Sequence, residues 1–407
     1  MAQPETSGFS IRSRRPIRQP SGWPAGFLGM LALVMVVEFT VVRSSARSPS
    51  PALLHWREVG RSIDKAVGSD VVVLGDSLLK YDLVSPVIEA RLGAGRQVYN
   101  LAVPGGCAPS SYFLLRRLLD KGGRPSIVLT DGETFDVNPL DRASAWSELL
   151  TPGELLEFSR RTGDGAFLGA RAVELAVPSV GARASLRLSL LDFIGGRSET
   201  WPTTVEVLRR NLAVNRGGVV LHDNYITSDG DPRLADLERI GYMPPPFGCR
   251  LVNHLYVMKF LELAARHEIK VVWLLPPYHP EVQRRATKGG RMATYAEYIR
   301  GLLTLFPNLS VASAWKGNYP PETLTDMTHL GRTGAIIFSD NVGRYIRRKL
   351  EGQTTFRWVE LERYDAHAVE ALAEFALVED DGRSYQVLKG IELARASRTT
   401  SLMNLRR

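Results

Sequence analysis

The sequence predicts an α/β domain built on a parallel β-sheet. Three observations support this fold class: short apolar runs typical of buried strands, helical periodicity between most of them, and small polar residues where strands end. Strands that alternate with helices favour a parallel sheet with right-handed crossovers. The strand-like runs lie at residues 70–75, 96–101, 126–130, 269–275 and 309–313.

Helical periodicity accounts for most of the remaining domain. It appears at residues 83–92 and 112–119, and returns at 332–350 after the last strand. An insertion at about 140–255 interrupts the alternation between the third and fourth strands, and we expect it to form a helical cap over the ligand edge of the sheet. Residues 351–407 form a C-terminal extension for which the sequence indicates no role.

The N-terminal residues predict a membrane anchor. Residues 1–22 are a basic tail, and the apolar residues 23–42 are long enough to cross a lipid bilayer once. Positive charge before this segment places the N-terminus in the cytoplasm and the main domain outside it, in the cell envelope. A cleaved signal peptide is the alternative. Residues 43–57 are rich in Ser, Pro and Arg and predict a linker, so the folded domain is expected at 58–350.

Composition limits the classes of partner. The 407 residues are 44% hydrophobic, enough for a packed core, and the net charge of +8 comes partly from arginines near both ends of the chain. No zinc-finger spacing or RNA-binding motif is present, so no nucleic-acid partner is expected. His222 and Asp223 have no third ligand at a fixed spacing, so no metal is expected. No cofactor is expected either. The sequence leaves open whether Cys107 and Cys249 form a disulfide.

The stretch VVVLGDSLLK, residues 71–80, ends a buried strand in Gly75, Asp76 and Ser77. A serine at the carboxyl end of a parallel strand presents its hydroxyl to the crevice where open α/β sheets bind ligands. The alternative is a plain strand-to-helix turn in which Asp76 or Ser77 serves as the helix N-cap.

The stretch TDMTHLG supplies a base and a carboxylate. A nucleophilic serine needs a base, and the base needs a partner that fixes its tautomer. Asp326 and His329 are three residues apart, and their loop follows the last core strand at the same sheet edge as Ser77. A solvated helix start would also explain this spacing.

The stretch YNLAVPGGCAPSS places Gly105 and Gly106 after the second strand. Backbone N–H groups there can approach a substrate oxygen without obstruction by side chains, and together with the amide of Ser77 they would stabilise an oxyanion. A Pro-Gly-Gly turn with no chemical role is the alternative.

These three motifs, in this order, resemble those of the SGNH (GDSL-type) hydrolase superfamily. The resemblance implies a flavodoxin-like, three-layer fold and acyl transfer through an acyl-enzyme. It further implies that Ser77 is the nucleophile, His329 the general base and Asp326 its orienting carboxylate. The amides of Ser77 and Gly105 would be the oxyanion donors.

The resemblance covers residues 68–135 and 268–350 and departs from the family in one motif. The family has G-x-N-D after the third strand, where this chain has TDGETFDVN. No Asn stands at the expected place; Glu133, Thr134 or the more distant Asn138 occupies the region.

Further residues near the sheet edge are weaker candidates for substrate binding. Tyr278 and His279 follow the fourth strand in LLPPYHPE, where a Pro-fixed loop is the alternative. Asp76, Gly106 and Glu133 flank the three motifs.

The expected function is that of an anchored, extracytoplasmic, serine-dependent O-acyl esterase or O-acetyltransferase acting on a cell-surface glycan. The chain is similar in organisation to membrane-tethered SGNH-like proteins that O-acetylate extracellular polysaccharides. Its partners would be an acylated glycan or acyl donor, with membrane proteins of envelope biosynthesis as further candidates. A non-catalytic polysaccharide-binding or scaffold module and a lipid esterase are the alternatives.

Overall fold

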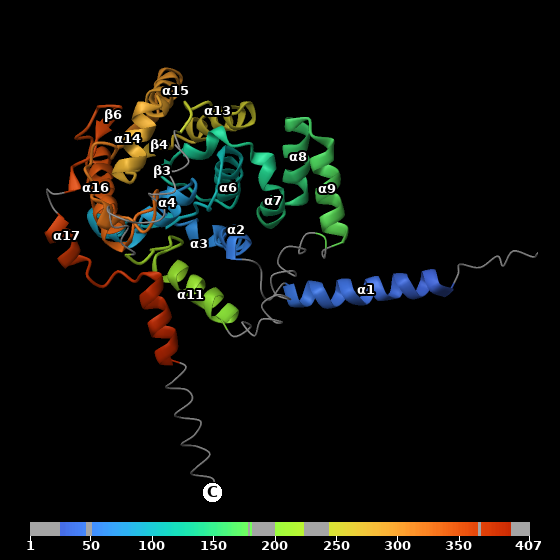
Figure 1. Ribbon diagram of the computed structural model, residues 1–407. Helices are drawn as coiled ribbons and strands as arrows, with labels where there is room; N and C mark the ends of the chain where they lie inside the picture. The colour runs from blue at the N-terminus through green and yellow to red at the C-terminus, as the bar shows by residue number, and fades with distance from the viewer. Residues whose placement is uncertain are drawn as a thin grey trace, which may run out of the picture.

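The computed structural model describes residues 25–45, 51–177, 180, 200–223, 244–364 and 368–391. Within these residues the chain forms one α/β domain around a six-stranded, all-parallel sheet (Figure 1). The strand order β2-β1-β3-β4-β5-β6 begins with the 2-1-3-4-5 order of flavodoxin-like folds. The strands are β1 Val71–Val73, β2 Val98–Asn100, β3 Ile127–Thr130, β4 Lys270–Leu275, β5 Leu309–Ser313 and β6 Trp358–Glu360.

The sheet is buried on both faces, as the apolar strand runs predict. Val71 and Val73 pack into one hydrophobic cluster, and Val72 between them packs into another on the opposite face. This alternation follows from the two-residue period of a strand, and it accounts for a strand made only of valines. All five predicted strands are confirmed.

Helices cover the two faces as separate layers, which gives three layers in total. In one layer α6 and α13 lie side by side (Figure 1). That layer contains α2 Pro51–Arg61, α3 Ile63–Ala66, α6 Ala108–Asp120, α13 Leu251–Arg266 and α15 Arg291–Leu305. The other contains α4 Ser77–Asp82, α5 Ser85–Leu92, α16 Arg332–Leu350 and α17 Ala368–Glu374.

The linker predicted at residues 43–57 is wrong for its last seven residues. Helix α2 begins at Pro51, a residue tolerated in the first turn of a helix because it needs no intrahelical N–H bond there. Leu54 and Trp56 are buried, and the Trp56 indole N–H donates a hydrogen bond of 3.0 Å to the carbonyl of Pro104. The domain therefore begins at Pro51, before the predicted start at residue 58.

The predicted domain end at residue 350 is also wrong. Strand β6 pairs with β5 at the edge of the sheet, and α17 packs against α16. Residues 381–391 form a further helix. At least part of the predicted C-terminal extension therefore completes the α/β domain.

The described part of the predicted insertion mostly enlarges one helical layer. Trp146, Phe158 and Phe167 join the same hydrophobic cluster as α6 and α13. Residues 224–243 lie outside the described residues, so a cap over the ligand edge stays a prediction. The helices are α7 Ala143–Leu149, α8 Pro152–Thr162, α9 Gly165–Ala176 and α11 Thr200–Val214.

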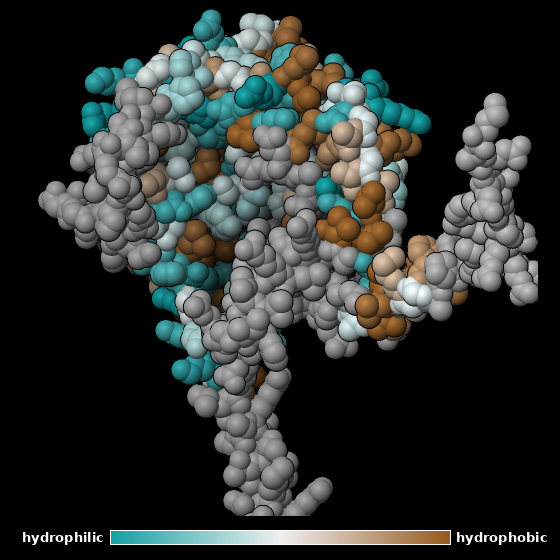
Figure 2. Space-filling model, turned by 45° about the vertical axis from the view of Figure 1, so that its right-hand side comes forward, coloured by the Kyte–Doolittle hydropathy of each residue, from teal (hydrophilic) through white to brown (hydrophobic). Residues whose placement is uncertain are grey.

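The N-terminal helix α1, Ala25–Ser45, contributes to neither hydrophobic cluster. Several of its apolar side chains are exposed, among them Met35 and Phe39. Figure 2 shows apolar residues in several separate groups on the face that it draws, with polar residues between them. Among the described residues, no helix combines the length and the apolar character needed to cross a membrane. The anchor at 23–42 stays a prediction, and the tail at 1–22 lies outside the described residues.

Candidate active site

The turn after β1 delivers Ser77 to the carboxyl edge of the sheet. Gly75 is required there because a Cβ atom would lie only 2.6 Å from Oδ1 of Asp131. Asp76 is the N-cap of α4, and its carboxylate accepts a hydrogen bond of 2.8 Å from the Leu78 amide. Ser77 is the first residue of α4. The turn therefore provides both an N-cap, which is Asp76, and a hydroxyl group at the sheet edge, which is that of Ser77.

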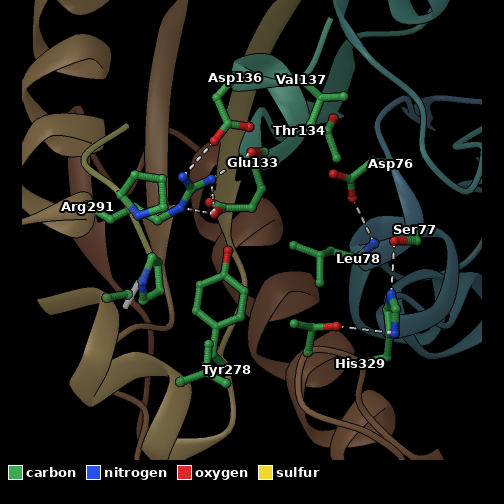
Figure 3. A pocket seen from close by; sticks show the side chains of 15 residues that line it. Asp76, Ser77, Leu78, Glu133, Thr134, Asp136, Val137, Tyr278, Arg291 and His329 are labelled. Atoms are coloured by element: carbon green, nitrogen blue, oxygen red, sulfur yellow. Dashed lines mark hydrogen bonds and ion pairs between the residues drawn. The ribbon is translucent and has the colours of Figure 1, made fainter. Parts of the chain in front are cut away.

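The loop after β5 brings an imidazole to this hydroxyl. His329 Nε2 lies 2.9 Å from Ser77 Oγ, across 252 positions of the chain (Figure 3). On the other side of the ring, His329 Nδ1 lies 2.7 Å from Asp326 Oδ2. Asp326 Oδ1 accepts hydrogen bonds of 2.8 Å from the amides of Thr328 and His329, which fix the carboxylate. The structure thus brings the three residues of the predicted triad together.

The charges of this cluster favour a protonatable imidazole. Burial acts to raise the pKa of Asp326, but the hydrogen bond and charge of His329 outweigh it and lower that pKa to about 2. Burial acts to lower the pKa of His329, but the hydrogen bond and the charge of Asp326 raise it above its usual value. The ring of Tyr81 packs edge-on against the imidazole, with 5.1 Å between centroids. Asp326 therefore stays ionised while His329 takes up a proton.

Asp82 is a site residue that the sequence does not single out. It ends α4, the helix that Ser77 begins, and its Oδ1 accepts a hydrogen bond of 2.8 Å from the Leu330 amide. Burial raises the pKa of Asp82 well above its usual value. Asp82 thus ties α4, the helix that Ser77 begins, to the loop that carries His329. Its only sequence signal is a carboxylate at a helix end, which is common on protein surfaces.

A second buried carboxyl group, that of Asp131, supports the turn that carries Asp76. Asp131 Oδ1 accepts a hydrogen bond of 3.2 Å from the Asp76 amide. Burial raises the pKa of Asp131 well above its usual value, and the charge of Asp76 raises it further. Both effects favour the protonated form of the Asp131 carboxyl group, which supports the Gly75–Asp76 turn.

The amides of Gly105 and Gly106, in the loop after β2, differ in their hydrogen bonds. The Gly106 amide donates a hydrogen bond of 2.7 Å to the Val103 carbonyl, so it is not available to a substrate. Within the described chain, the amides of Gly105 and Ser77 donate to no protein acceptor. Gly105 has a positive φ of 69°, which favours glycine. The role of Gly105 as an oxyanion donor stays a prediction, since it does not line the pocket described next.

A pocket of about 370 Å³ opens in front of Ser77 and His329. Its apolar wall includes Leu78, Val137 and Val282, and of the predicted insertion's described residues only Pro244 and Pro245 line it. Asp76, Glu133 and Tyr278, three of the weaker candidates, also line it, as Figure 3 shows. The pocket lies between the ends of β1 and β3, the point where strand order reverses and α/β sheets bind ligands.

His279 and Gly106, the other two weaker candidates, do not line this pocket. His279 is the N-cap of α14, Pro280–Lys288, and its Nδ1 accepts a hydrogen bond of 3.3 Å from the Glu281 amide. Nδ1 of His279 is therefore engaged by the helix that follows, and substrate contact by this residue stays a prediction.

Arg291 is the second site residue that the sequence misses. Its guanidinium bonds to Glu133 Oε1 at 2.8 Å and to Asp136 Oδ2 at 2.7 Å, and it stacks 5.7 Å from the Phe247 ring centroid. Burial raises the pKa of Glu133, while the charge of Arg291 opposes the shift. Arg291 is 158 positions from Glu133, so no local pattern could reveal the pair.

Thr134 occupies the region where the SGNH pattern has its Asn. Its hydroxyl donates a hydrogen bond of 2.5 Å to the Gly106 carbonyl. This bond joins the loops after β2 and β3. Among the described residues that line the pocket in front of Ser77, none has a side-chain amide.

The arrangement as a whole is suited to nucleophilic acyl transfer. An alcohol, an imidazole and a carboxylate form one hydrogen-bonded chain beside a pocket. Across the described parts of the chain, no group of three or more His, Cys, Asp or Glu side chains is placed to hold a metal.

No model of a known protein family matches the chain, and no curated protein matches it. Function is therefore inferred from the geometry of the site.

Proposed function

We propose that the protein is an SGNH-type, serine-dependent O-acyl esterase or O-acetyltransferase. The observation that carries the proposal is the position of His329 between Ser77 Oγ and Asp326 Oδ2, at 2.9 Å and 2.7 Å. These distances are those of a nucleophile–base pair with its orienting group.

The reaction begins when Ser77 Oγ attacks the carbonyl carbon of an ester and His329 Nε2 takes the hydroxyl proton. Asp326 stabilises the imidazolium that forms, and the amides of Ser77 and Gly105 stabilise the oxyanion. The tetrahedral intermediate collapses, the C–O bond to the alcohol breaks, and His329 returns its proton to that alcohol. An acyl group then remains on Ser77.

The second half of the reaction regenerates Ser77. A hydroxyl group gives its proton to His329 Nε2 and attacks the acyl-enzyme, and Ser77 recovers the proton as it leaves. Water as the attacking group gives an esterase, and a sugar hydroxyl gives an acetyltransferase. Both outcomes use the same three side chains.

A glycan ester is the proposed substrate. The pocket of about 370 Å³ combines apolar walls with charged groups and has room for a sugar ring that carries a small acyl group. Export and an anchor at residues 23–42, both predictions from the sequence, would place this site at the cell surface. A series of 4-nitrophenyl esters from acetate to decanoate separates this substrate class from lipids, since a lipid esterase prefers the long chains.

The test of the proposal is the hydrolysis of 4-nitrophenyl acetate by the Ser77→Ala variant. We expect kcat/KM to fall by a factor on the order of 10³ or more, with an unchanged circular dichroism spectrum. Ser62→Ala removes a serine hydroxyl that bonds to the Glu58 carbonyl away from the pocket, and it should retain full activity. Activity that survives in Ser77→Ala would remove the proposed nucleophile.

Thr134 motivates a second candidate, a non-catalytic polysaccharide-binding module. With its hydroxyl bonded to the Gly106 carbonyl, the site has no side-chain oxyanion donor at this position, and one such donor is worth about 10²–10³ in rate. This candidate predicts no turnover by the wild-type protein and glycan binding that persists in both Ser77→Ala and His329→Ala.

A further inference from the structure

A second cavity of about 450 Å³ adjoins the active-site pocket. Tyr278 lines both spaces, and α14 separates them beyond it. Val282 and Ala286 of this helix line the active-site pocket, whereas Gln283 and Thr287 line the second cavity. The second cavity is therefore the neighbouring space for a ligand that extends past Tyr278.

The lining of the second cavity combines aromatic rings with neutral hydrogen-bonding groups. Trp315, from the loop after β5, supplies a partly exposed ring, and the buried Tyr319 of the same loop lines the wall beside it. The exposed Asn318 lies between them, and Gln283 donates a hydrogen bond to the Trp315 carbonyl from the α14 side. Aromatic faces with a few amides and hydroxyls match a sugar ring, which has apolar C–H faces and polar edges.

The two spaces differ in charge. In the active-site pocket Arg291 is paired with both Glu133 and Asp136, so carboxylates outnumber cations there. Arg284 and Lys288 line the second cavity, and none of its described lining residues is a carboxylate. Arg284 pairs with Glu281 at 2.7 Å.

Lys288 is the cation of this cavity that has no ion-pair partner among the described residues. Its side chain is exposed, and it forms no ion pair or hydrogen bond with any other residue in the described ranges. The second cavity therefore favours an anionic group more than the active-site pocket does, because the Arg291 cation in that pocket is already paired with two carboxylates.

We propose that the second cavity binds an acidic sugar, such as a uronic acid, next to the sugar whose ester reacts at Ser77. This assignment rests on the proposed function for its role in catalysis, although binding itself does not require it. The sugar carboxylate would lie at Lys288 and its ring against Trp315. The substrate class is then an acidic heteropolysaccharide in which a neutral acylated sugar neighbours a uronate.

The test is a binding titration of the Ser77→Ala protein with tetragalacturonate and with neutral cellotetraose. We expect tetragalacturonate to bind more tightly, and added Lys288→Ala to weaken it by about fivefold or more. Cellotetraose affinity should be unchanged by Lys288→Ala. The matched control is Lys316→Ala, since this lysine is 78% exposed in the same loop as Trp315 but does not line the cavity.

Equal binding of the two tetrasaccharides, or tetragalacturonate binding that is unchanged by Lys288→Ala, would overturn the assignment. Failure of the proposed function gives a different result, because it appears as 4-nitrophenyl acetate hydrolysis that does not depend on Ser77. Lys316→Ala in the protein with Ser77 intact should hydrolyse that small ester at the wild-type rate, since Lys316 lines neither space.

Discussion

The buried carboxyl group of Asp82 accepts a hydrogen bond of 2.8 Å from the amide of Leu330, the residue that follows His329. Helix α4 therefore contacts the His329 loop at both of its ends, since it begins with Ser77 and ends with Asp82. A shift of the His329 loop would have to break this buried hydrogen bond together with the contact to Ser77.

Substitutions of Asp82 test this connection. Asp82→Ala leaves the Leu330 N–H without its acceptor and should lower the free energy of unfolding by about 1–3 kcal/mol. Asp82→Asn retains an acceptor oxygen, so esterase activity should be retained better than in Asp82→Ala. Urea denaturation and 4-nitrophenyl acetate kinetics measure the two effects, with the exposed Asp120→Asn as control.

The raised pKa of Asp82 predicts how the stability of the protein depends on pH. The pKa of Asp82 in the folded protein lies well above 3.8, so the stability linked to its protonation is present at low pH and is lost as pH rises through the folded value. Asp82→Asn cannot ionise. Its stability relative to the wild type should therefore increase as the pH rises above 3.8. A difference that is constant with pH would contradict a protonated Asp82.

Asp326→Asn should change both the rate and its pH profile. The neutral form of His329 is the base, and its pKa is raised, so wild-type kcat/KM should increase with pH with a midpoint above 6.5. Without the Asp326 carboxylate the midpoint should move to lower pH, and the maximal rate should fall by about 10³–10⁴. A pH–rate profile measures both. An unchanged midpoint would argue against Asp326 as the partner of His329.

Arg291→Met tests the ion cluster at the pocket wall. The substitution leaves Glu133 and Asp136 without their shared cation, and we expect a loss of about 1–3 kcal/mol in the free energy of unfolding, because the pairs are partly buried. Arg284→Met breaks an ion pair whose arginine is 64% exposed and should cost less than about 0.5 kcal/mol. Equal losses in the two variants would show that burial does not strengthen the cluster.

Trp56→Ala tests whether α2 belongs to the domain. The indole is 3% exposed and bonds to the Pro104 carbonyl, so its removal should cost about 3–5 kcal/mol. Phe356→Ala truncates a ring that is 75% exposed and should have little effect. A thermal melt of each variant gives the comparison, and a negligible effect of Trp56→Ala would restore the linker interpretation.

The sequence predicts the sheet better than the ends of the domain. Strands such as Val71–Val73 are buried on both faces and therefore form apolar runs that stand out from their neighbours. Strand β6 has only three residues, partly exposed at the sheet edge, and gives no such run. Helix α2 was obscured because its Pro51 follows a Ser- and Pro-rich stretch.

Among the site residues too, those in recognisable sequence motifs were predicted, and those that act through distant partners were not. Ser77, Asp326 and His329 lie in short motifs whose spacing carries chemical meaning, and the sequence predicts that they meet. Asp82 and Arg291 act through partners 248 and 158 positions away, so their importance depends on the tertiary structure.

The most direct measurement of the central claim is covalent labelling by an alkyl fluorophosphonate, with the modified residue identified by peptide mass spectrometry. A serine whose proton is taken by His329 should form one phosphonate adduct, on Ser77, and His329→Ala should slow its formation by about 10³ or more. Absence of an adduct on Ser77 in the folded wild-type protein, or labelling at the same rate in His329→Ala, would contradict the account.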